Sequence, residues 1–154
     1  MSSRARQLQL RTRLAAWSDR VQVEASALAE RYRDLLPRRI TNAQLSGLTN
    51  IVQAVSTFAE IEKFVTHQGQ KAARAGRADM QEYWPDVGKA LEELRREAER
   101  MWTETPGGPA ASSREARNSL DEFHCRLARE FVQHLVAHSL FLGRQEEKVS
   151  SRPS

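Results

Sequence analysis

The chain has little cysteine, few aromatic residues and no long apolar run, and each shortage excludes a class of protein. Its 154 residues include one cysteine, Cys125, so an internal disulfide is excluded and nothing indicates an oxidising compartment. No apolar stretch approaches the roughly 20 residues that span a membrane. The first residues carry arginines without an apolar segment, which argues against a secretory signal. We therefore expect a soluble, cytoplasmic protein.

Motifs of catalysis are also missing. The adjacent glycines Gly107 and Gly108 stand between prolines in a predicted linker, so no glycine-rich loop that cradles phosphate is present. There is no G-x-S-x-G sequence and no convincing pairing of Cys125 with a histidine. The acidic residues alternate with basic ones, and no carboxylate pair stands out. The sequence predicts neither an enzyme nor a cofactor.

Charge, and arginine in particular, is abundant. Asp, Glu, Lys and Arg make up 29% of the chain, its formal net charge is +4, and 20 of its 24 basic residues are arginine. A guanidinium group binds phosphate through paired hydrogen bonds and stacks on bases, whereas an ammonium group acts as a point charge. The arginine excess is consistent with a nucleic-acid partner, and a GC-rich genome would produce the same bias.

Apolar residues recur at helical spacing along most of the chain, and the alternation typical of strands is absent. We predict an all-α fold, a bundle of about five helices with a long N-terminal helix. The first helix is expected over residues 5–36 and ends before Pro37, whose ring and missing N–H oppose continuation.

The second helix has the clearest start signal. Thr41 and Gln44 form a T-x-x-Q capping box, and Ile40 and Leu45 have the spacing of a hydrophobic staple. Gly47 is a poor helix former, so it predicts a close helix crossing.

Similar signals bound the third and fourth helices. Thr57 with Glu60 is a second candidate capping box, and Gly76 is a plausible C-terminal glycine of that helix. Pro85 fits the first turn of the fourth helix, which is expected to end near Trp102.

The fifth helix is expected to be capped by Ser112 with Glu115 and to end near Leu142, with Gly143 closing it. The chain is thus predicted to be one helical domain, divided as follows: flexible N-terminus 1–4, bundle 5–142 with a flexible linker at about 103–112, and disordered tail 143–154.

The basic segment 64–77 is the first candidate for binding phosphate. It contains no acidic residue, and His67, Lys71 and Arg74 fall at i, i+4 and i+7 on one helix face, followed by Arg77. Like charges this close repel one another, so an anionic ligand would relieve that cost. The alternative is an exposed helix end where cations are favoured by the helix dipole.

Two further sets of arginines are candidates. Arg38 and Arg39 lie in the short turn between the first two predicted helices. Arg6, Arg13 and Arg20 are each seven residues apart and would form a ridge with steps of about 10 Å along the first helix. Such a ridge suits a nucleic-acid backbone, or its side chains extend along the edge of the core.

One row of side chains has the spacing of a metal site. Glu130, His134 and His138 are four residues apart on one helix face, and two such histidines can hold zinc. However, H-E-x-x-H is absent and Cys125 is out of phase with the row. We favour packed, hydrogen-bonded histidines and predict no metal; a metal-dependent enzyme that uses His134 and His138 is a remote alternative.

The aromatic residues form two groups. Those on the apolar stripes are predicted to lie in the core: Trp17, Phe58, Phe64, Phe123 and Phe131. Three others lie near predicted helix ends, where they form either lids over the bundle or a partner-binding patch: Tyr83, Trp84 and Trp102.

Three stretches, in this order, resemble the small subunits of type III CRISPR effector complexes: "ITNAQLSGLTNIV", "FAEIEKFVTHQGQKAAR" and "LAREFVQHLVAHSLF". The resemblance covers mainly residues 40–75 and 118–142. It implies a non-catalytic subunit whose copies stack head to tail along a ribonucleoprotein. Such subunits contact other effector-complex subunits and line the path of the guide–target duplex, formed by crRNA and target RNA, with basic side chains.

The residues that match this role are His67, Lys71 and Arg74, with Arg77 beside them. Arg38 and Arg39 are a weaker correspondence, and the arginine-rich first helix lies outside the match. The function expected from the sequence is RNA contact within an antiviral effector complex. The alternative is a helical adaptor that binds protein and touches no nucleic acid.

Overall fold

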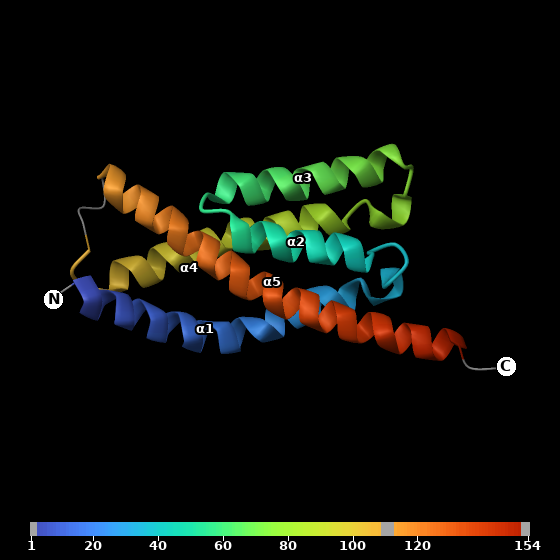
Figure 1. Cartoon of the computed structure of the whole chain (residues 1–154), viewed down its shortest axis with the longest axis horizontal. Coiled ribbons are helices and arrows are strands. Elements are labelled where there is room, and N and C mark those ends of the chain that lie inside the picture. The colour runs from blue at the N-terminus through green and yellow to red at the C-terminus, as the bar shows by residue number, and fades with distance from the viewer. Residues whose placement is uncertain (1–2, 109–112, 152–154) are drawn as a thin grey trace.

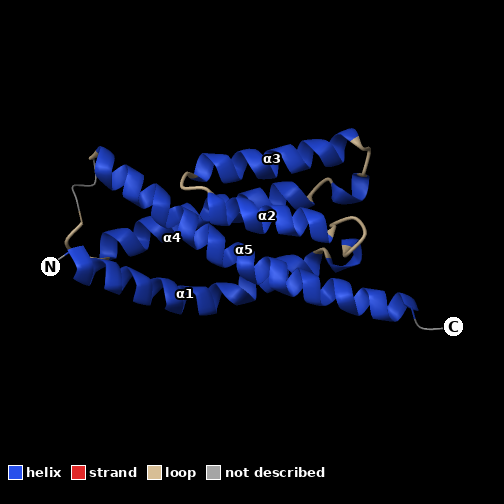
Figure 2. Cartoon of the chain, viewed as in Figure 1, coloured by secondary structure: helices blue, strands red, loops and turns tan. Residues whose placement is uncertain are grey.

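The structure, a computed structural model, describes residues 3–108 and 113–151 and is built almost wholly from helices (Figures 1 and 2). The predicted all-α bundle with a long N-terminal helix is confirmed, and no strand occurs in the described ranges. The five α-helices are α1 (Ser3–Arg31), α2 (Asn42–Ala54), α3 (Phe58–Arg74), α4 (Tyr83–Glu104) and α5 (Arg114–Ser151). Two 3-10 turns, η1 (Arg33–Leu35) and η2 (Ala78–Met80), lie between them.

α5 is the longest helix and organises the bundle. It runs diagonally across the other helices and packs against α1, α2 and α4, while α3 packs mainly on α4 at one edge (Figure 1). The largest fully buried side chains come from α2 to α5, from η2 and from the turn before α2: Ile40, Leu45, Leu48, Ile61, Met80, Tyr83, Trp84, Leu91, Met101, Leu127, Leu135 and Leu142. None of the described helices combines the length and the apolar character that a membrane crossing requires.

The start of α2 is built as the sequence predicts. Thr41 Oγ1 accepts a hydrogen bond from the Gln44 N–H at 3.2 Å, and Gln44 Oε1 accepts one from the Thr41 N–H at 3.0 Å. Leu45 is fully buried. A Cβ at Gly47 would lie 3.2 Å from the ring of Phe64, so glycine permits the predicted close crossing of α2 and α3.

The start of α3 differs from the prediction. Thr57 makes no side-chain cap; instead the Phe58 N–H donates to Asp121 Oδ2 of α5 at 3.2 Å. The Arg95 guanidinium of α4 donates to the other oxygen of this carboxylate, also at 3.2 Å. The capping box of Thr57 with Glu60 is therefore wrong, because a carboxylate from another helix satisfies the free N–H.

The two long helices have ends that the sequence did not indicate. α1 ends at Arg31, earlier than expected, and η1 replaces its last turn. α5 continues to Ser151, so the expected end at Leu142 and a disordered segment over 143–151 are wrong. A Cβ at Gly143 would lie 3.3 Å from Pro37 Cβ. Gly143 therefore allows the turn after α1 to approach α5 closely and does not terminate the helix.

The remaining helix ends agree with the sequence in part. α4 extends to Glu104, and Pro85 lies in its first turn as predicted. Ser112 lies outside the described residues; Ser113 Oγ accepts from the Ala116 N–H at 3.0 Å and caps the first turn of α5. Gly76 follows α3 with a φ of 68°, which favours glycine.

Tyr83 and Trp84 are core residues, exposed by 1% and 0%, so they do not form a partner-binding patch. Tyr83 packs edge-on against Tyr32 of the α1–η1 junction, and Trp84 packs edge-on against Phe64 of α3. Trp102 is half-buried near the end of α4.

Candidate nucleic-acid interface

The candidate interface is the solvent-facing side of α3. The opposite side of this helix is buried and consists of Phe58, Ile61, Val65, Gln68 and Ala72. His67, Lys71 and Arg74 are exposed, as the helical spacing predicts, and Arg77 is exposed in the turn that follows. A rigid, well-packed helix therefore presents a row of basic side chains to solvent, which we call the α3 basic face (His67, Lys71, Arg74 and Arg77).

No acidic side chain of the described residues forms an ion pair with the α3 basic face. Among residues 3–108 and 113–151, no ion pair or side-chain hydrogen bond involves any of its four members. Acidic residues of α3 are confined to its first half, where Glu60 and Glu62 lie nearer the positive end of the helix dipole. The cations are concentrated at the negative end, so this arrangement also stabilises the helix.

Arg38 and Arg39 lie at the same end of the bundle as the last turn of α3. Arg39 Nε is 3.2 Å from Asp79 Oδ2, which joins the turn before α2 to η2. Arg39 is therefore occupied by a local carboxylate, whereas Arg38 is exposed and has no recorded partner among the described residues. The pair of Arg39 and Asp79 thus connects the turn that carries Arg38 to η2, the short helix that follows the α3 basic face in the chain.

The stripe of Arg6, Arg13 and Arg20 is not a free ridge. Arg6 is only 6% exposed; its guanidinium donates to the carbonyl oxygens of Thr105, Pro106 and Trp102 and lies 4.3 Å from the centre of the Trp102 ring. This burial lowers the pKa of Arg6.

Arg13 lies about two helical turns after Arg6 and contacts the same end of α4. Its guanidinium is 2.9 Å from Glu104 Oε2 and donates to the Glu104 carbonyl at 3.4 Å. Arg6 and Arg13 therefore bind the free carbonyls and the negative dipole end of α4, which favours, for these two residues, the alternative of side chains that extend along the edge of the core. Arg20 alone remains exposed without a recorded partner in the described chain.

The row of Glu130, His134 and His138 faces α1. The Ser18 hydroxyl donates to Glu130 Oε2 at 2.8 Å, so its contact with His134 Nε2 at 2.9 Å requires the imidazole N–H to donate. His138 Nε2 lies 3.0 Å from Glu30 Oε1. These side chains connect α5 to α1, and no cluster of three or more possible metal ligands occurs in the residues that the structure describes.

Sequence reasoning missed a buried histidine. His124 Nε2–H donates to the Leu91 carbonyl at 2.9 Å, the ring stacks on Phe58 with centroids 3.9 Å apart, and Nδ1 is buried without a partner. Burial lowers its pKa, so the imidazole is neutral. Its neighbour Cys125 is also buried, which raises the pKa of the thiol to about 11 and keeps it protonated. Neither residue is poised as a nucleophile or base.

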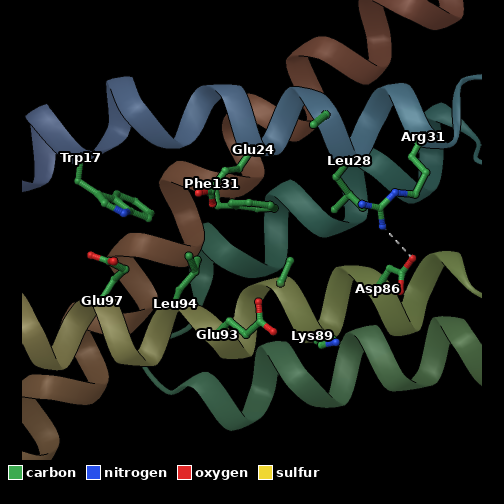
Figure 3. A pocket seen from close by; sticks show the side chains of 12 residues that line it. Trp17, Glu24, Leu28, Arg31, Asp86, Lys89, Glu93, Leu94, Glu97 and Phe131 are labelled. Carbon is green, nitrogen blue, oxygen red and sulfur yellow. Dashed lines mark hydrogen bonds and ion pairs between the residues drawn. The ribbon is translucent and has the colours of Figure 1, made fainter.

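Two of the hollows on the surface of the bundle bear on function. One, of about 830 Å³, opens between α2 and α3 beside the α3 basic face and includes Ile51, Phe64 and His67 in its lining. The other, of about 390 Å³, lies between α1 and α4 (Figure 3). Comparison of the chain with protein-family models, curated proteins and solved structures finds no match.

Proposed function

We propose that this chain is a non-catalytic small subunit of a type III CRISPR effector complex, acting in antiviral defence. In this role the α3 basic face contacts the phosphate backbone of guide and target RNA. The observation that carries the proposal is that His67, Lys71 and Arg74 project from one face of a packed helix and pair with no acid in the part of the chain that the structure describes. The resemblance of residues 40–75 to such subunits supports the same role for this face.

The chemistry of the face suits sequence-independent binding. Phosphate contacts require only positioned cations, whereas base recognition requires side chains that reach base edges. His67 and Arg74 are about 10 Å apart along the helix axis, so the row follows a short stretch of RNA backbone. A partner strand would also relieve the repulsion among the cations. Head-to-tail copies and other effector subunits are the expected protein neighbours.

The test is RNA binding by the purified chain, measured by fluorescence anisotropy of a labelled single-stranded RNA over a range of salt concentrations. Three phosphate contacts predict a slope of roughly −2 for log affinity against log salt. Lys71→Glu with Arg74→Glu should lower affinity at low salt on the order of tenfold or more and flatten that slope.

The matched control is Arg96→Glu with Arg117→Glu, which makes the same change in net charge on α4 and α5. Both arginines are exposed and lack a recorded partner among the described residues. The control should retain most of the affinity. Equal losses in the two double variants would mean that only net charge matters. No RNA binding by the wild-type chain, alone and in its native assembly, would favour the helical adaptor instead.

A further inference from the structure

α1 and α4 are joined at their two ends and separated between them. At one end, Arg31 lies 3.4 Å from Asp86 Oδ2, and the Tyr32 hydroxyl donates to the same carboxylate oxygen. At the other end, Arg6 and Arg13 bind the last residues of α4. Both helices pack against α5. The space between the two connections is therefore closed by α5 on one side and open to solvent on the other.

This α1–α4 groove (lined by residues between Trp17 and Arg31 of α1, between Asp86 and Glu97 of α4, and by Phe131 of α5) has an apolar floor. Trp17, Leu94 and Phe131 lie along it, with the Phe131 ring between α1 and α4 and the Arg31–Asp86 pair at one end (Figure 3). Its edges carry the small residues Ala27 and Ala90. The floor side chains Trp17, Leu94 and Phe131 are only 3–5% exposed, so the floor is shallow. The exposed Ala27 and the half-buried Ala90 present their methyl groups above it.

The edges of the α1–α4 groove are acidic. Its lining contains the acidic residues Glu24, Asp86, Glu93 and Glu97 and the basic residues Arg31 and Lys89, in a chain whose net charge is +4. Arg31 and Asp86 neutralise each other. Glu97 is 2.6 Å from Arg100, but Glu24 and Glu93 have no recorded partner in the described residues and face the groove from opposite helices.

We infer that the α1–α4 groove binds an amphipathic helix of a protein partner, with apolar side chains against the methyl groups of Ala27 and Ala90 and lysine or arginine side chains against Glu24 and Glu93. From Trp17 to Arg31 the groove is about 21 Å long, which matches roughly four turns of a helix. An apolar floor between charged edges is the arrangement by which grooves bind amphipathic helices. Lys89 lies near the Asp86 end, so the partner's basic residues should gather toward Glu93 and Glu97.

The groove is independent of the α3 basic face, and its charge disfavours RNA. The inference therefore goes beyond RNA contact and survives if the chain binds no RNA. It also gives a role to Glu24 and Glu93, which face each other across the groove without a basic partner among the described residues.

The experiment uses the full chain and two fluorescein-labelled synthetic peptides of about 14 residues, the length of the groove. One contains leucine and lysine with leucines at helical spacing, and the other replaces every lysine with glutamate. Anisotropy should show about tenfold tighter binding of the leucine–lysine peptide, weakening as salt rises. Glu24→Lys with Glu93→Lys should remove that preference, and Ala27→Trp, which fills the groove without changing charge, should weaken binding about as much.

The matched control for charge is Asp19→Lys with Glu147→Lys, two exposed acids outside the groove. This variant should bind the leucine–lysine peptide as the wild type does, and all variants should give the wild-type helical circular dichroism. Three results would each overturn the inference: no binding by the wild type, equal binding of both peptides, or full binding by the Ala27→Trp and Glu24→Lys/Glu93→Lys variants. RNA affinity, measured in parallel, should be no lower in the groove variants than in the wild type.

Discussion

α1 and α3 both carry rows of basic side chains, but the two helices use them differently. Arg6 and Arg13 of α1 reach across to α4 and bond to its last carbonyls and a carboxylate. His67, Lys71 and Arg74 of α3 face solvent without a recorded partner in the described chain. The cause is position: α1 lies beside the C-terminal end of another helix, whereas the cations of α3 lie on the outer side of a helix at the edge of the bundle (Figure 1).

Local sequence does not separate these two cases. Residues 4–18 of α1 contain no acid, just as residues 64–77 do not. The partners of the α1 arginines come from α4, 91 residues further along the chain for Arg13 and Glu104. A basic stretch without acids is therefore a candidate for binding phosphate only when the tertiary structure leaves its cations unpaired. The cations of α3 meet that condition, and most of the α1 stripe does not.

The largest expected effect comes from removing the buried arginine of α1. Arg6→Ala should lower the free energy of unfolding by about 2–4 kcal/mol, because the carbonyls at the end of α4 lose a charged donor and Trp102 loses its stacked partner. Urea denaturation followed by circular dichroism measures this change. Arg11→Ala, an exposed position on the same helix, is the control and should change stability by less than about 0.5 kcal/mol.

RNA affinity of the folded Arg6→Ala variant should match that of the wild type. A large loss of RNA binding with little loss of stability would place Arg6 in the interface and reverse the comparison between α1 and α3.

The sequence predicts local interactions well and distant ones poorly. The capping box of Thr41 and Gln44 involves residues three apart, so the pattern contains both partners. By contrast, Asp121 caps α3 from 63 residues away, and Arg129 of α5 donates to the Val52 carbonyl near the end of α2 at 3.3 Å. In the sequence, Asp121 and Arg129 look like ordinary charged residues, because their partners come close only in the folded bundle.

The candidate site shows the same division. Helical spacing correctly predicts that His67, Lys71 and Arg74 share an exposed face, because the helix alone determines it. Whether a cation is paired depends on other helices, as Arg39 shows through its contact with Asp79. Gly143 is a comparable case: a glycine that reads as a helix end instead makes room for Pro37 within a continuing helix.

The pH dependence of the free energy of unfolding distinguishes the buried His124 from an exposed histidine. The folded pKa of His124 lies below its ordinary value near 6.5, so as pH falls the unfolded chain takes up a proton first and the folded state loses stability. Stability from this residue is complete above about pH 6.5 and declines below it. Urea denaturation at pH 7.5 and 5.5 should show a loss that His124→Phe reduces. His67→Phe, at an exposed position, serves as the control. If the stability of His124→Phe declined as much as that of the wild type, the pH dependence could not be assigned to His124.

The ion pair of Arg13 and Glu104 should contribute much less than Arg6. Its side chains are 39% and 47% exposed, and solvent screens such pairs. A double-mutant cycle with Arg13→Ala and Glu104→Ala should give a coupling free energy of about 0.2–1 kcal/mol that shrinks in high salt. A coupling above about 2 kcal/mol would mean that the seam between α1 and α4 is drier than the structure indicates.

The smallest effect on stability is expected on α3. Lys71→Ala and Arg74→Ala should each change the free energy of unfolding by no more than about 0.5 kcal/mol, the remnant of their favourable interaction with the helix dipole. Paired with the loss of RNA affinity proposed for this face, that result would separate function from stability at the same two positions. Losses above about 1 kcal/mol, with RNA affinity intact, would instead show that these cations serve the helix end, as Arg6 and Arg13 serve the end of α4.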